Sequence, residues 1–236
     1  MKLFKLAVLF ICLSASVNAQ VTKTIVKKTA AAPVTKTAGT RVKVTTDMGV
    51  IIIRLYDATP QHRDNFIKLV SSHFFDSLLF HRVINGFMIQ GGDPLSKNAQ
   101  PGEVLGSGGG DMARIPAEFK PNLIHKKGVL AAARDGNPEK ASSACQFYLV
   151  QGKVMNDIEL NQVECSIRNT NPDFTYTPEQ RKIYKTIGGT PFLDMNYTVF
   201  GEVEKGLEVI DKIAAVQTAP GDRPIKDIRM KIELLK

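Results

Sequence analysis

The strongest constraint on the fold is a series of short, strand-like apolar segments that runs from residue 41 to the C-terminus. Each segment alternates apolar with polar residues or is rich in β-branched residues, as strands are. The 18 glycines and 12 prolines show no repeat period and indicate many turns. The segments expected to be strands are 42–44, 50–56, 79–90 (two strands joined by a bend at Gly86), 128–133, 146–151, 197–203 and 228–234.

Two segments have helical spacing instead. Residues 60–74 begin with Pro60 as first helical residue after Thr59 as N-cap, and residues 205–216 place their large apolar side chains on one face. Many short strands and two helices far apart in sequence favour a mainly β fold. We expect a closed antiparallel barrel with a helix over each opening, because closure removes exposed strand edges.

The first 19 residues have the pattern of a secretory signal peptide. Lys2 and Lys5 precede an apolar run at 6–13, and the small residue Ala19 ends the segment before Gln20. The alternative, an uncleaved anchor, would need a longer apolar run. We expect cleavage near Ala19-Gln20 and export to the periplasm or the medium. No later apolar run reaches the length of a membrane span, so no membrane-spanning segment is expected in the mature chain.

Residues 20–40 are rich in Thr, Lys and Ala, with no aromatic and no acidic residue. Such a segment buries too little apolar surface to offset its chain entropy, so we expect a flexible basic tether before a domain at 41–236. Much of the net charge of +8 lies here. No basic stripe interleaved with aromatic residues occurs elsewhere, which favours solvation or weak attraction to anionic surfaces over specific nucleic-acid binding.

Residues 152–190 are polar and weakly periodic, and they indicate an insertion that is partly helical near 178–185. Cys145 and Cys165 remain after removal of the leader. Export permits a disulfide between them, but two unpaired thiols are an equal alternative. The glycines of 106–110 lack the Lys-Ser/Thr of a phosphate loop and favour a mobile surface loop.

The four histidines, at 62, 73, 81 and 125, have none of the spacings of a zinc hydrolase, and no serine-hydrolase elbow is present. No cofactor is expected. The segment 80–93, FHRVINGFMIQGGD, offers a different chemistry. Period-two geometry places Met88 and Gln90 on one face of a strand, close to Arg82. A shallow apolar pocket beside one cation and one amide suits a proline ring and its neighbouring carbonyl groups.

This segment resembles the F-H-R-x-I-x-G-F-M-x-Q-G-G-D signature of the cyclophilin family of peptidyl-prolyl cis-trans isomerases. Two further blocks are similar to that family: GVLAAAR at 128–134 with CQFYL at 145–149, and FLDMNYTVFG at 192–201. The resemblance covers residues 41–236, is weakest over 152–190 and is closest to exported bacterial members. It implies a cyclophilin-like fold, a closed eight-stranded β-barrel capped by two α-helices, and a protein without a cofactor, expected to be a monomer.

By this resemblance Arg82 is the catalytic residue. The X-Pro bond rotates over a barrier of about 18–20 kcal/mol, which arises from resonance between the amide nitrogen and the carbonyl. A donor aimed at the prolyl nitrogen favours its pyramidal form, which is complete only in the twisted transition state. An arginine suits this role because its charge is permanent and its planar fork also holds a neighbouring carbonyl.

The resemblance also implies the binding residues for proline-containing polypeptides. The walls of the proline pocket are Phe87, Met88, Tyr148 and Leu193. Gln90 binds the peptide backbone and orients Arg82, Gln146 is a polar contact on the rim, and the strand at 133–134 pairs with the peptide before proline. The site residues expected on this basis are Arg82, Phe87, Met88, Gln90, Ala133, Arg134, Gln146, Tyr148, Phe192, Leu193 and Tyr197.

Three positions depart from the family pattern. Phe192 replaces a frequent Trp, and members without that indole donor are typically poorly inhibited by cyclosporin. Tyr197 stands where His is frequent and keeps an aromatic wall with a polar tip. Arg134 replaces a frequent Asn and alters the expected preference for the residue before proline. None of the three removes the arginine or the pocket.

Each site residue also has a plainer interpretation. Taken alone, Arg82 is more readily an ion-pair residue, and Phe87, Met88 and Tyr148 are more readily core residues. The order and spacing of the three blocks favour an isomerase. The alternative is a binding module that kept the pocket without catalysis, and a nucleic-acid-binding protein is a weaker third hypothesis. His81, next to Arg82, is expected on the opposite strand face.

Overall fold

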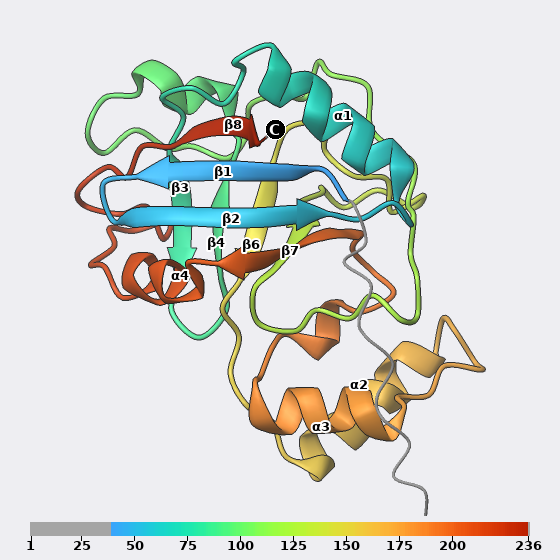
Figure 1. Ribbon diagram of the computed structural model, residues 1–236. Helices are drawn as coiled ribbons and strands as arrows, with labels where there is room; N and C mark the ends of the chain where they lie inside the picture. Colours follow the sequence, from blue (N-terminus) through green and yellow to red (C-terminus); the bar gives the residue numbers. More distant parts are fainter. Residues whose placement is uncertain (1–38, 236) are drawn as a thin grey trace, which may run out of the picture. The chain divides into compact units, whose positions relative to one another are not determined.

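The computed structural model describes residues 39–235, and the proposed leader and nearly all of the tether lie outside this range. Eight strands form one antiparallel sheet in the order β3-β4-β6-β5-β7-β2-β1-β8 (Figure 1). The mainly β class is therefore confirmed. The strands are β1 Arg41–Thr46, β2 Gly49–Leu55, β3 Phe80–Ile84, β4 Met88–Gly91, β5 Val129–Ala132, β6 Phe147–Val150, β7 Val199–Lys205 and β8 Lys231–Leu235.

The sheet is an open half-barrel, so the prediction of a closed barrel is wrong. The edge strands β3 and β8 do not pair along their length, and one isolated bridge, Leu79 to Arg229, joins the segments before them. The edge of β3 is covered in another way. The N–H of Phe80 donates to Ile228 O at 3.0 Å and that of Val83 to Asp222 O at 2.8 Å. A covering loop protects a strand edge without closure.

The structure contains more helices than the two predicted caps. Helix α1, Pro60–Ser71, and helix α4, Leu207–Ala214, both form and pack against the sheet, although each is shorter than predicted. Helices α2, Asp157–Arg168, and α3, Pro178–Thr186, lie in the insertion and pack against each other (Figure 1). Two short 3₁₀ segments, Pro94–Asn98 and Pro191–Leu193, complete the described elements. None of the described helices is long and apolar enough to span a membrane.

The main core lies between the sheet and the helices. The ring of Phe66 on α1 contacts those of Phe75, Phe147 and Phe200 at centroid distances of 5.0–5.5 Å. Aromatic contacts of this kind add to the free energy of burial. Gly92 permits one close approach in this region, because its φ is +93° and a Cβ there would lie 2.1 Å from Cys145 O.

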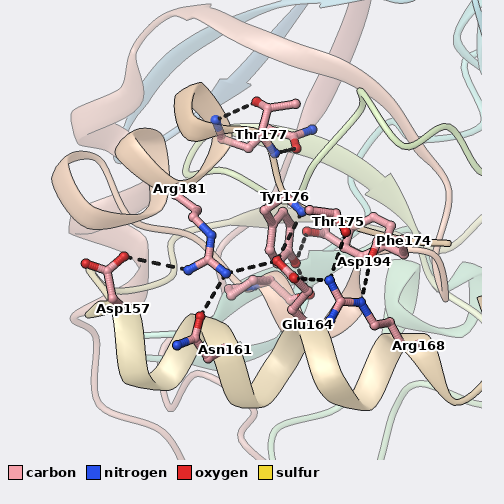
Figure 2. A network of polar contacts seen from close by, with 12 residues as sticks. Asp157, Asn161, Glu164, Arg168, Phe174, Thr175, Tyr176, Thr177, Arg181 and Asp194 are labelled. Atoms are coloured by element: carbon pink, nitrogen blue, oxygen red, sulfur yellow. Dashed lines mark hydrogen bonds and ion pairs between the residues drawn. The ribbon is translucent and has the colours of Figure 1, made fainter. Parts of the chain in front are cut away.

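The insertion has a small core of its own, made of residues such as Leu160, Ile167 and Tyr184. Capping boxes begin both of its helices, from Asn156 for α2 and from Thr177 for α3. Figure 2 shows how Glu164 of α2 joins the two helices: it accepts hydrogen bonds from Arg181 of α3 and from the backbone N–H of Tyr176. The insertion is therefore an ordered unit.

Both cysteines in the described range are free: Cys145 is buried and Cys165 is exposed. Burial raises the pKa of the Cys145 thiol. Of the two alternatives open at the level of sequence, the structure has unpaired thiols.

Candidate active site

A cavity of about 420 Å³ opens beside β3, β4 and β6. Strand pairing builds it from distant parts of the chain, because β4 lies between β3 and β6 and pairs Gln90 with both Arg82 and Tyr148. Nine of the predicted site residues line it together with the loop at 105–107. They are Arg82, Phe87, Met88, Gln90, Ala133, Arg134, Tyr148, Leu193 and Tyr197.

Arg82 stands at the mouth of this cavity. Its side chain is 42% exposed, and its Nε lies 3.3 Å from Asp222 Oδ2, a carboxylate that is itself 44% exposed. Its Nη1 lies 3.5 Å from Gln90 Oε1, at the outer limit of a hydrogen bond. Asp222 thus contacts Nε, while Nη1 faces Gln90, which also lines the cavity. The guanidinium is thus paired through Nε, while its other N–H donors stay accessible to a substrate.

A chain of amides holds Gln90 in place. Its Nε2 donates to Gln146 Oε1 at 3.0 Å, and Gln146 Nε2 donates to the carbonyls of Gly106 and Gly108, both at 2.9 Å. These bonds fix both amide orientations and direct Gln90 Oε1 toward Arg82. Gln146 was predicted to lie on the rim of the pocket. It lines an adjoining hollow instead of the main cavity.

The inner wall of the cavity is apolar and buried. Met88, Tyr148 and Leu193 belong to a second core cluster. The Tyr148 hydroxyl lies 3.1 Å from His125 Nε2, and burial raises the pKa of this tyrosine well above its usual value. The hydroxyl is therefore neutral at physiological pH, which suits a wall that faces a proline ring.

His125 is held by Asp194, which is buried at 2% exposure. One carboxylate oxygen accepts the backbone N–H of His125 at 2.8 Å and lies 2.7 Å from its Nδ1. The other accepts the hydroxyls of Tyr176 at 2.7 Å and Tyr184 at 2.5 Å, both from the insertion. Asp194 thereby connects the insertion to the pocket wall. Figure 2 shows Asp194 beside Tyr176 of the insertion.

The second side of the cavity is aromatic and cationic. The Arg134 guanidinium stacks on the Tyr197 ring at 4.6 Å and donates from Nε to Asn196 O at 3.0 Å. The backbone N–H and C=O of Ala133 are already paired within the protein, to Gln146 and Ser143. Within residues 39–235 no backbone partner is found for Arg134, so its peptide groups can pair with a bound chain.

The matching family model, cyclophilin type peptidyl-prolyl cis-trans isomerase/CLD, covers residues 41–233. The chain belongs to the cyclophilin family. Relatives named as peptidyl-prolyl cis-trans isomerases include a Staphylococcus saprophyticus protein, 32% identical over 185 residues that make up 77% of this chain and 84% of the relative. A Staphylococcus haemolyticus protein is 31% identical over 189 residues, 80% of this chain and 87% of the relative. The enzyme activity of the chain is therefore peptidyl-prolyl cis-trans isomerisation.

The fold of this cyclophilin is similar to a solved structure of a Cryptosporidium parvum cyclophilin type peptidyl-prolyl cis-trans isomerase. The two superpose with a TM-score of 0.62 at 22% identity over 84% of this chain and 98% of the other. A second structure of that protein, determined in the presence of the dipeptide Ala-Pro, has a TM-score of 0.58 at 21% identity, over 83% and 99% of the two chains.

Besides Gln146, one more predicted site residue of the cyclophilin lies outside the cavity. Phe192 is 53% exposed, and its ring packs on that of Phe87 at a centroid distance of 5.6 Å. The 3₁₀ turn at 191–193 explains this, because it directs Leu193 into the cavity and its neighbour outward. Phe192 therefore extends the aromatic surface beyond the pocket.

The cavity also includes residues that the sequence pattern assigned elsewhere. His81, expected on the opposite face, lines the cavity because a bulge between Phe80 and Arg82 breaks the alternation of β3. The loop at 106–110, expected to be mobile, forms a wall and is tied down by Gln146 and by Asp93, which accepts the N–H of Gly106. The available signal in the sequence was the glycine-rich segment 106–110, which follows the signature after twelve residues.

His81 is the least satisfied polar group at the site. It is 2% exposed, and neither ring nitrogen has a hydrogen-bond partner in the described part of the chain. Burial lowers its pKa to about 4, against the pull of Asp93. The ring is thus neutral at physiological pH and adds no charge beside Arg82. No cluster of three or more potential metal ligands occurs in residues 39–235.

Proposed function

We propose that this enzyme isomerises prolyl bonds in unfolded or folding exported proteins, with Arg82 as the catalytic residue. The observation that carries the proposal is the position of Arg82: accessible, paired at one edge, and at the mouth of a cavity whose inner wall is dry and apolar. A proline ring placed against Met88 and Tyr148 would bring its nitrogen to the guanidinium.

The step needs no bond to be made or broken in the protein. The barrier to rotation about the X-Pro bond, about 18–20 kcal/mol, is the amide resonance lost in the twisted state. As the bond twists, the nitrogen lone pair leaves this resonance and can accept a hydrogen bond. A guanidinium N–H that donates to this lone pair binds the twisted state more strongly than either planar isomer. Such differential binding lowers the barrier in both directions and leaves the equilibrium unchanged.

The remaining polar groups suit the peptide backbone. Gln90, fixed by the amide chain, offers its carboxamide to a substrate carbonyl or N–H and orients Arg82. The free N–H and C=O of Arg134 can pair with the residues before proline as an added strand. The substrate class would be extended polypeptide, in keeping with the Ala-Pro dipeptide used with the Cryptosporidium protein.

Isomerisation is tested with the purified full chain and an Ala-Pro peptide. We expect faster cis-to-trans conversion and an unchanged equilibrium ratio. Faster refolding of a protein limited by proline isomerisation would extend the result to folding clients. Equal rates with and without the protein would overturn the proposal.

Export is proposed from residues 1–19, where Lys2, Lys5 and the apolar run at 6–13 have the pattern of a leader. Cell fractionation and mass spectrometry of the mature N-terminus test it. The expected result is a chain that begins at Gln20 outside the cytoplasm and sediments as a monomer. A cytoplasmic chain that keeps its first 19 residues would contradict it.

A further inference from the structure

A second groove lies beyond Phe192, between helix α2 and the segment that forms one wall of the proline cavity. Its volume is about 400 Å³. The apolar residues of this groove are Met155, Val163, Ile167 and Phe192. Glu159, Gln162, Ser166 and Asn196 add polar groups. Gln162 and Ser166 are exposed on the surface of α2, and the Glu159 carboxylate accepts the backbone N–H of Asn156 at 2.8 Å. An apolar hollow with polar groups at its edge is the usual form of a side-chain subsite.

The groove and the cavity share one wall, made of residues 192–197. Leu193 and Tyr197 line the cavity, whereas Phe192 and Asn196 line the groove. Phe192 also packs on Phe87, which lines the cavity. The two hollows are therefore neighbours on one continuous surface.

The insertion holds the far side of the groove in a fixed position. Helix α2 packs on the 3₁₀ turn at 191–193, and its own core residue Ile167 reaches the groove. Asp194, within the shared wall, binds two tyrosine hydroxyls of the insertion. A subsite held by buried contacts of this kind needs little ordering when a ligand binds.

The walls of the two hollows touch, which places both within reach of one peptide. Phe87, which lines the cavity, and Phe192, which lines the groove, pack together with their ring centroids 5.6 Å apart, and each residue of an extended chain spans about 3.3–3.6 Å. A chain with its proline in the cavity would therefore reach the groove within a few residues. The apolar lining selects an apolar side chain there, and the polar rim serves the peptide backbone.

We propose that this groove is an extended subsite, which binds an apolar side chain of the same polypeptide a few residues from the isomerised proline. The inference rests on the proposed function and adds a substrate preference to it. The enzyme would favour prolines near exposed apolar residues, which are typical of unfolded chains.

The test compares three groups of peptides around one Ala-Pro core: the short core, the core lengthened by serines, and the same length with leucine two, three or four residues to either side of proline. We expect wild-type kcat/KM to be about fivefold higher for at least one leucine peptide than for its serine match. This is the gain from covering about half of a leucine side chain. Equal values for all leucine and serine peptides would overturn the inference.

Variants on α2 locate the effect. Val163→Glu places a charge in the groove and should abolish the leucine preference, while kcat/KM for the short core stays unchanged. Ile158→Glu is the matched control: it is on the same helix and 70% exposed, but does not line the groove. It should keep the preference. Ser166→Trp, at an exposed groove position, fills the hollow and should likewise abolish the leucine preference. It replaces Val163→Glu in the test if that variant does not fold.

The outcomes separate the two proposals. If the wild-type enzyme did not isomerise the short core peptide, the proposed function itself would be contradicted. Normal short-core turnover with a leucine preference that survives both Val163→Glu and Ser166→Trp would overturn the subsite alone.

Discussion

Arg82 has one charged neighbour in the described chain, and the strength of that contact decides how free the guanidinium is. Its Nε lies 3.3 Å from Asp222, and both side chains are more than two-fifths exposed. An ion pair at that exposure contributes little, commonly below about 1 kcal/mol. The pair therefore positions Arg82 without holding it away from a substrate.

This leads to a prediction for Asp222→Asn. The variant keeps the shape of the side chain and removes its charge, so we expect kcat/KM for an Ala-Pro peptide to change by less than about threefold. A peptide isomerisation assay checks it. Loss of most activity would mean that the carboxylate takes part in catalysis, contrary to the role assigned to Arg82.

Single residues of the site were predictable where strand alternation holds. Met88 and Gln90 share one face of β4, as period two requires, and Arg82 meets them from β3. His81 and Phe192 were not predictable in this way. A bulge redirects the first, and a 3₁₀ turn directs the second outward; both depend on tertiary contacts that no local pattern contains.

At the scale of elements, the insertion and the pocket meet in one buried carboxylate. Asp194 accepts hydrogen bonds from His125 and from two tyrosine hydroxyls, and His125 contacts the pocket residue Tyr148. Buried acceptors with several donors are costly to remove, because each donor is left without a partner. The position of α3 and the wall of the pocket are therefore coupled.

We predict that Asp194→Asn lowers the free energy of unfolding by about 3–5 kcal/mol. The substitution replaces one accepting oxygen with an NH₂ group, which cannot accept the hydrogen bonds that this oxygen received. Chemical denaturation measures the effect. Asp157→Asn is the matched control: it is exposed and pairs with Lys185 and Arg181, and should cost less than about 1 kcal/mol. Equal losses in the two variants would show that the network does not support the fold.

Elements differed in how well the sequence predicted them. The hairpin at 42–56, helices α1 and α4 and the closing strand follow from periodicity and turn residues. Helix α2 was missed, because its apolar residues are weakly periodic, although Asn156 and Glu159 carry a capping-box signal. The closed barrel was wrong because loops at 222 and 228 cover β3, which removes an open edge as effectively as closure.

For the whole molecule, the buried histidines predict sensitivity to acid. Burial lowers the pKa of His81 from 6.5 to about 4, and burial also lowers the pKa of His62 despite its contact with Glu118. Both rings bind protons more readily in the unfolded chain. The contribution of these two histidines to the free energy of unfolding is therefore full above about pH 6.5 and is lost as the pH drops toward 4.

The contribution of His81 can be isolated with His81→Leu. A pKa decrease from 6.5 to about 4 corresponds to about 3 kcal/mol, so the variant should lose about that much less stability between pH 7 and pH 4 than the wild type. Denaturation at a series of pH values measures it. His73→Asn, at an exposed position, should follow the wild-type profile. A His81→Leu profile parallel to the wild type would contradict the buried, neutral ring.

The most direct test of the central claim separates binding from turnover at Arg82. Exchange NMR on an Ala-Pro peptide reports cis–trans interconversion, while methyl shifts of Met88 report occupancy of the cavity. For Arg82→Ala we predict that the peptide still shifts the Met88 signal and that catalysed exchange slows by about a hundredfold or more, the usual effect of removing one donor to a transition state. Exchange at the wild-type rate in this variant would contradict the account.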